Sequence, residues 1–255
     1  MSPRPLLGLL LLLSGCSRAP DAAALLTETR QRLAERDGKL QSYVLAGTAR
    51  EAGQTLSFQF AFRAPQKMLG TLGPPTRRTW AWDGTHLLER DDAARTFSTY
   101  EEPPTPERRV GALTALFTPF VPEGFRAPLL PGQGVSARRT SHALAPEALE
   151  LTVKPPGGDV EVVYVLRWPG LDFLAKRLRS GPDTSELRVE AEQCEAALGL
   201  CVPRRLTQWS AGTQVAETEL TQVELNPPLP ADTFTLTPPP GYSVGRKTFA
   251  EEQAP

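Results

Sequence analysis

Cysteine and histidine are the side chains best suited to nucleophilic or metal chemistry, and the chain has three cysteines and two histidines. They are Cys16, Cys194, Cys201, His86 and His142. Neither histidine has a candidate nucleophile close by in the sequence, and two histidines far from the cysteines make a poor zinc site. The sequence also lacks a Gly-x-Ser-x-Gly elbow, a phosphate-binding loop, a dinucleotide fingerprint and a His-Glu-x-x-His motif. We therefore expect a protein that is not an enzyme and that holds no metal.

Cys16 follows a short apolar segment at the N-terminus. Arg4 precedes the run from Leu6 to Leu13, and Ser14 and Gly15 lead directly to the cysteine. A positive start, a short apolar run and small residues are typical of a secretory signal peptide. The run is much shorter than the roughly 20 residues that a membrane-spanning helix needs. The ending Leu-Ser-Gly-Cys resembles a bacterial lipobox, so we expect removal of residues 1–15 and a lipid on Cys16. The alternative is an ordinary signal peptide with a chance cysteine.

The residue after Cys16 bears on where the protein is delivered. Ser17 is compatible with export to the outer membrane under the sorting rule of enteric bacteria, in which aspartate at this position retains the protein at the inner membrane. We expect residues 16–24 to form a lipidated tether and the protein to face the periplasm. The covalent lipid is the only cofactor that the sequence suggests.

The two remaining cysteines can pair with each other. Cys194 and Cys201 are an even number in an exported, oxidising compartment, where disulfides form and persist. Their short separation indicates a bridge that closes one hairpin end. The alternative is a pair of buried thiols.

The composition limits the class of protein. With 28 basic and 29 acidic residues, the formal charge of −1 argues against a nucleic-acid partner. The chain is long enough to bury a core as a single domain. Its 26 prolines and 20 glycines, set among short alternating segments, favour an all-β architecture.

The pattern of apolar residues changes along the chain. A helical spacing over Ala22–Arg36 predicts an amphipathic helix, and a second short helix is predicted to end at Pro119. The remaining chain predicts eleven to twelve short strands, separated by a long connection from Pro128 to Thr140. Residues 246–255 are expected to be a flexible tail.

The clearest strand carries large apolar side chains at every second position, and another strand has two tryptophans spaced in the same way. A sheet of about a dozen short strands must curl and enclose space. An apolar interior of this kind suits acyl chains, with the second helix as a lid. The alternative is an ordinary packed core. The candidate lining residues are Leu56, Phe58, Phe60, Phe62, Trp80, Trp82, Leu113 and Phe117.

Three segments resemble the LolA/LolB superfamily of lipoprotein carriers and receptors. They are SYVLAGTAR after the first helix, FQFAFRAPQKM followed by WAWDGTHLLE, and the terminal VELNPPLPADTFTLTPPPGYSV. The resemblance covers the chain from Leu25 to Val244. It implies a mainly β (α+β) fold, an unclosed antiparallel β-barrel of about eleven strands capped by short helices, in a domain spanning 25–245. It also implies a short final strand over Phe234–Leu236.

The resemblance further implies a function. A lipid-anchored member is more similar to the outer-membrane receptor than to the soluble carrier. We therefore expect a monomeric envelope protein that binds acyl chains or lipoproteins, receives them from a periplasmic carrier and takes part in lipoprotein localisation to the outer membrane. The alternative is a non-catalytic interaction or sensor module that has the same fold without a lipid cavity.

Overall fold

A computed structural model describes residues 22–101, 105–128, 130–154 and 157–248. The expected signal peptide, Cys16 and most of the tether lie outside these residues, as do positions 249–255 of the expected tail. Within the described part, no helix is both long and apolar enough to cross a bilayer.

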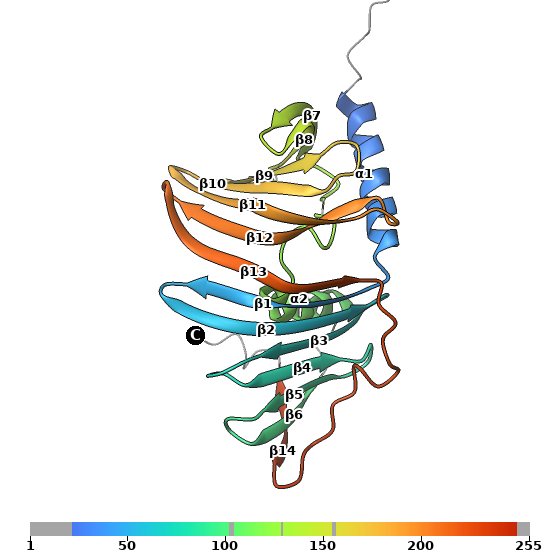
Figure 1. Ribbon diagram of the computed structural model, residues 1–255, viewed down its shortest axis with the longest axis vertical. Coiled ribbons are helices and arrows are strands. Elements are labelled where there is room, and N and C mark those ends of the chain that lie inside the picture. Colours follow the sequence, from blue (N-terminus) through green and yellow to red (C-terminus); the bar gives the residue numbers. More distant parts are fainter. Residues whose placement is uncertain (1–21, 102–104, 129, 155–156, 249–255) are drawn as a thin grey trace, which may run out of the picture.

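One large sheet forms the body of the protein (Figure 1). Its first half contains β1 (Ser42–Glu51), β2 (Gln54–Arg63), β3 (Lys67–Leu72), β4 (Arg78–Trp82), β5 (Leu87–Asp91) and β6 (Thr96–Glu101). Its second half contains β7 (Val135–His142), β8 (Ala145–Val153), β9 (Val160–Arg167), β10 (Phe173–Ser180), β11 (Asp183–Glu195), β12 (Leu200–Ser210) and β13 (Thr213–Leu225). The last strand is β14 (Ser243–Thr248).

The strand order shows that the sheet is open. It runs β14-β6-β5-β4-β3-β2-β1-β13-β12-β11-β10-β9-β8-β7, so β13 returns beside β1 and joins the two halves. The pairs along this order are antiparallel except for β14, which lies parallel to β6. Within the described chain, β7 and β14 are the two outer strands and do not pair with each other. The expected unclosed, mainly β fold is therefore confirmed.

The helices cover one face of the sheet, which we call the inner face. Helix α1 (Ala22–Lys39) lies along the half from β7 to β13, whereas α2 (Pro106–Phe117) lies behind β1 and β2 (Figure 1). Leu25 and Leu33 of α1 pack against Leu149, Leu166 and other apolar residues of the second half. A short 3-10 helix, η1 (Thr118–Phe120), continues α2. The two predicted helices are confirmed, and each buries its apolar side on the sheet, as a short isolated helix requires.

The structure has more strands than the expected eleven to twelve: fourteen are found in the described residues. One unexpected strand is β7, which lies largely within the segment interpreted as a connection. Its residues, VSARRTSH, are mostly polar because β7 is an outer strand with exposed positions such as Arg138.

The second unexpected strand corrects the C-terminal boundary. Arg246–Thr248 were expected to begin a flexible tail, but they belong to β14. The strand expected at Phe234–Leu236 is absent, because Phe234 lies in a turn and the next two residues are irregular. Side chains of β14 are mainly exposed, so its sequence lacks the apolar alternation of a half-buried strand. Its position depends on pairing with β6, which a local pattern cannot reveal.

The chain between β13 and β14 runs along the ends of the strands from β1 to β6 (Figure 1). Asn226 begins this segment with a positive φ of 52°. Its side-chain oxygen accepts hydrogen bonds from the N–H groups of Gln41 and Ser42, at 2.8 and 3.1 Å, and its amide donates to the Lys39 carbonyl. Asn226 therefore fixes the junction between α1 and β1 to the end of β13.

Candidate functional site

The centre of the inner face is made of aromatic side chains. The period-two geometry of β2 directs Phe58, Phe60 and Phe62 to this face, where all three are buried. Tyr43 of β1 lies opposite Phe62, and their rings stack with centroids 4.9 Å apart. Leu56, at the outer end of the same strand, is only partly buried. Leu56 therefore differs in burial from the three phenylalanines that precede the end of β2.

The two tryptophans lie on the same face, two strands away. Phe60 pairs with Gly70 of β3, and Gly70 pairs with Trp80 of β4, so the three positions form a row across the sheet. Trp80 is 5% exposed and Trp82 is 3% exposed. Phe120 of η1 rests over this row, with ring centroids 6.2 Å from Phe60 and 5.8 Å from Trp80.

Helix α2 closes over the aromatic side chains. Thr105 caps its N-terminus by accepting a hydrogen bond from the Arg108 N–H. Leu113 and Phe117 are buried, and the Phe117 ring lies 6.0 Å from that of Phe60. We define the aromatic cluster as the buried rings on this part of the inner face: Tyr43, Phe58, Phe60, Phe62, Trp80, Trp82, Phe117, Phe120 and Phe125.

Of the candidate lining residues, all except Leu56 belong to one continuous packed core together with these rings. Two open pockets, each of about 230 Å³, lie elsewhere: one over β10, β11 and β12, and the other at the ends of β1 and β13. Neither is lined by any of the candidate residues. In this conformation, α2 and η1 thus occupy the space over the sheet where an acyl chain was expected.

A buried charged group borders the aromatic cluster. Glu89 of β5 pairs with Trp80, so it also faces inward, and it is only 1% exposed. Its carboxylate accepts hydrogen bonds at 2.7 Å from the Tyr100 hydroxyl and from Lys247 of β14. Arg78 Nε lies 3.5 Å from the same carboxylate. The inner face is therefore apolar under α2 and charged towards β14.

Asp91 extends this charged region. Its carboxylate accepts a hydrogen bond from Arg78 Nε at 2.9 Å and another from the Ala94 N–H at 2.8 Å. Burial by itself would raise the pKa of Asp91, but these hydrogen bonds keep it below its ordinary value. Glu89 and Asp91 were not among the candidates from the sequence. They lie two and four residues after Leu87, so the period of a strand places them on the same face as Leu87 and beside the Trp-Ala-Trp strand.

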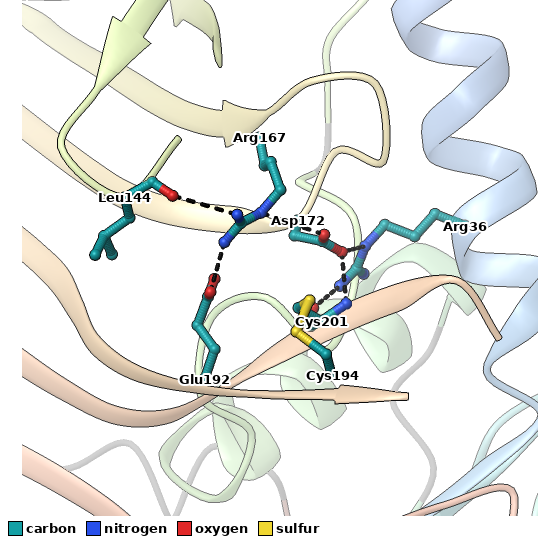
Figure 2. The surroundings of a disulfide bond; sticks show 7 residues. All are labelled: Arg36, Leu144, Arg167, Asp172, Glu192, Cys194 and Cys201. Carbon is teal, nitrogen blue, oxygen red and sulfur yellow. Dashed lines mark hydrogen bonds and ion pairs between the residues drawn. A yellow bond between two sulfur atoms is a disulfide. The ribbon is translucent and has the colours of Figure 1, made fainter. Parts of the chain in front are cut away.

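A second buried ionic cluster ties α1 to the sheet (Figure 2). Arg36 points from α1 towards Asp172 in the loop between β9 and β10, while Arg167 approaches Asp172 from β9. Arg36 donates hydrogen bonds to the carbonyls of Gly124, at 2.7 Å, and Cys201, at 3.2 Å. Burial lowers the pKa of Arg36, and the charge of Asp172 opposes this effect.

Arg36 was not among the candidates from the sequence, although the sequence contains a signal for it. Leu25, Thr29, Leu33 and Arg36 follow helical spacing and form the buried side of α1. An arginine at the end of an apolar stripe indicates a buried partner, because a charge is rarely buried without one. The identity of that partner, Asp172, has no signal in the local sequence.

Cys194 and Cys201 form a disulfide at the end of the β11–β12 hairpin. The Cys201 N–H also donates to Asp172 Oδ1 at 2.9 Å, so the bridge adjoins the Arg36 cluster (Figure 2). The side chain of Glu192 lies near both sulfur atoms. Because the sulfurs are bonded to each other, they present no thiolate ligands to a metal.

The remaining candidates for chemistry have ordinary partners. His86 is exposed, with its Nδ1 3.6 Å from the carboxylate of Asp83. His142 Nδ1 accepts a hydrogen bond from the Leu144 N–H at 3.3 Å. Cys16 lies outside the described residues, so its lipidation stays a prediction.

Comparison with known proteins provides evidence on the fold. A DUF1329 family protein from Desulfovibrio piger matches with a TM-score of 0.52 at 10% identity, over 82% of this chain and 96% of that chain. The chain shares its fold with this DUF1329 family protein. That fold is an unclosed sheet with helices on one face, as the sequence resemblance implied. At such low identity, structural likeness concerns the fold alone.

Two further structures are similar over most of this chain. LolA superfamily protein NE2245 from Nitrosomonas europaea matches at 15% identity with a TM-score of 0.47, over 82% of this chain and 97% of that chain. The Pseudomonas aeruginosa MucA/MucB complex matches at 14% identity with a TM-score of 0.33, over 83% of this chain and 60% of that chain. No protein-family model matches the sequence, and no curated protein matches it.

Proposed function

We propose that this protein is a lipid-anchored envelope protein that takes up acyl chains, free or on lipoproteins, between the sheet and α2. The observation that carries the proposal is the placement of α2 directly on the aromatic cluster, through Leu113 and Phe117. In this proposal the helix serves as a lid. Acyl chains enter when the helix moves away from the sheet.

Exchange of α2 for an acyl chain is physically reasonable because it replaces one apolar contact by another. Burial of an acyl chain stabilises a complex by about 0.8 kcal/mol per methylene group. Helix α2 has 12 residues, and a helix of that length has little stability apart from its packing. Binding can therefore compensate for the lost contacts of Phe117 and Phe120 without breaking the main sheet.

The expected lipid on Cys16 would hold this site close to a membrane. Five residues separate Cys16 from Ala22, where α1 begins. A chain of this length spans at most roughly 20 Å, since an extended residue covers about 3.3–3.6 Å. Together with Ser17, this supports a proposed location at the periplasmic side of the outer membrane. There the protein would accept acylated clients from a periplasmic carrier and assist lipoprotein localisation.

The lipid site can be tested by quenching of tryptophan fluorescence. In a chain carrying Cys16→Ser, Trp168→Phe and Trp209→Phe, the emission comes from Trp80 and Trp82 of the aromatic cluster. A fatty acid brominated along its chain should quench this emission on contact, and the unbrominated acid should compete. Mass spectrometry of the purified protein should also find copurified lipid.

A matched pair of variants makes the test specific. Phe120→Ala removes a ring from the aromatic cluster and should increase uptake of the fatty acid. Phe97→Ala removes another buried ring, which β6 directs to the opposite face of the sheet, and should leave uptake unchanged. Absence of quenching and of copurified lipid would contradict the proposal.

The anchor is tested separately. Cys16→Ser should move the protein from the membrane fraction to the soluble fraction. Ser17→Asp should keep it membrane-bound but shift it towards the inner membrane where the enteric sorting rule applies. Persistence of Cys16→Ser in membranes would show that another element anchors the chain.

The packed aromatic cluster also supports a second candidate function. With side chains of α2 and η1 filling the inner face, the fold could act as a non-catalytic interaction or sensor module in the envelope. This candidate predicts no displaceable fatty acid, and binding of a protein partner that is unaffected by Phe120→Ala.

A further inference from the structure

The pocket over β10, β11 and β12 lies on the face of the sheet opposite to the helices. Arg177 pairs with Glu186, and Glu186 pairs with Trp209, which places these residues in one row across three strands. The neighbouring Leu187 is partly buried and packs against the core that contains Leu25 and Leu33 of α1, so alternation directs the row outward. Arg179 and Arg188 complete the charged lining of this pocket of about 230 Å³.

Glu186 holds two of the arginines in place. It accepts a hydrogen bond from Arg177 Nε at 3.1 Å and two from Arg188, at 2.9 and 2.6 Å. Burial would raise the pKa of Glu186, but the hydrogen bonds from Arg188 and Arg177 keep it below its ordinary value. The carboxylate therefore stays ionised and orients both guanidinium groups.

After pairing with the Glu186 carboxylate, the arginines of the pocket still offer N–H donors and a net positive charge. The lining contains three arginines and one glutamate, and each guanidinium carries five N–H groups. Arg179 pairs with Glu161 at 3.3 Å, and its side chain is 57% exposed. Guanidinium groups bind phosphate through paired N–H donors, so converging arginines form a suitable site for this ligand.

Trp209 gives the pocket a fixed wall. Its indole N–H donates to Thr207 Oγ1 at 3.0 Å, and the Thr207 hydroxyl donates to Glu190 at 2.8 Å. The guanidinium of Arg188 lies over the indole ring, 4.9 Å from its centroid. This stacking restrains Arg188 from a second direction, which reduces the entropy lost on binding a ligand.

We propose that this pocket binds a phosphate group, carried by a lipid headgroup or by a soluble molecule, through Arg177, Arg179 and Arg188. This site is separate from the aromatic cluster, which lies on the other face of the sheet. It does not depend on acyl-chain binding.

The test uses the chain carrying Cys16→Ser and two probes. Glycerol 3-phosphate is titrated while the indole N–H signal of Trp209 is followed by NMR, and cosedimentation is measured with phosphatidylglycerol vesicles. Arg179→Gln should weaken binding about tenfold, or about 1.4 kcal/mol, because it removes one positively charged donor group from the phosphate. This variant leaves Arg177 and Arg188 paired with Glu186, so thermal unfolding should not change.

Arg138→Gln is the matched control, because Arg138 is an exposed arginine paired with Glu150 on another part of the sheet. Binding of both probes, or of either one alone, supports the site if Arg179→Gln weakens it and Arg138→Gln does not. Vesicle binding alone identifies a headgroup, whereas glycerol 3-phosphate binding alone identifies a soluble ligand. Binding of neither probe, or equal loss in both variants, would overturn the proposal.

Discussion

Phe120 rests against the Cα of Gly70 in the row between Phe60 and Trp80. A Cβ placed on Gly70 would lie 2.9 Å from Phe120 Cε2, which is closer than such contacts are normally found. Gly70 thus provides the space into which η1 inserts its aromatic ring.

Gly70→Ala should therefore destabilise the protein by about 1–3 kcal/mol, because the added methyl group displaces a packed ring. In the Phe120→Ala background the same substitution should cost much less, because the ring is gone. Urea unfolding of the four proteins in this double-mutant cycle measures the coupling. Additive effects would show that Phe120 does not occupy the position over Gly70.

Loss of the Arg36 side chain should have a large effect on stability. Arg36→Met leaves the buried Asp172 without its partner from α1, and breaking such a pair costs about 3–5 kcal/mol. Arg32→Met is the control on the same helix, because the exposed pair with Glu28 is worth about 0–1 kcal/mol. Denaturant unfolding checks both values. A similarly small loss of unfolding free energy in the two variants would mean that Arg36 contributes no more to stability than a surface residue.

Asp91 should make stability depend on pH in the acid range. Its folded-state pKa lies below its unfolded value of about 3.9, so its stabilising effect is present above that pH and disappears as the pH falls through the folded value. Asp91→Asn should thus be less stable than the parent at neutral pH, by about 1.5–3 kcal/mol. The difference should shrink below about pH 4.

Thermal unfolding as a function of pH checks this prediction. The exposed Asp159 provides the control, and the unfolding temperature of Asp159→Asn should follow that of the parent at every pH. A pH-independent difference between Asp91→Asn and the parent would show that the charge of Asp91 is not the cause.

Reduction of the Cys194–Cys201 disulfide should have a local effect. The bridge closes a loop with a sequence separation of 7, and chain entropy predicts a contribution of only about 2–3 kcal/mol for such a short loop. Hydrogen exchange should increase mainly at the end of the β11–β12 hairpin. Global unfolding in mild reductant would contradict this expectation.

Much of the fold could be predicted because its signals are local. The spacing of Leu25, Leu33 and their neighbours predicted α1, and the alternation of Phe58, Phe60 and Phe62 predicted both β2 and its buried face. A half-buried strand repeats every two residues and an amphipathic helix every 3.6, so both patterns can be read in one sequence. The resemblance in three segments then predicted the open sheet.

Three features depended on tertiary structure. Strands β7 and β14 form at the outer edges of the sheet, where side chains need not be apolar, so pairing with β8 and β6 determines them. The partner of Arg36 lies far along the chain at Asp172. The sequence also left open whether the candidate lining residues face a cavity or a packed core, since the same alternating phenylalanines can face either. Their sequence established that they are buried on one face, whereas the position of α2 and Phe120 decided that the rings pack against side chains.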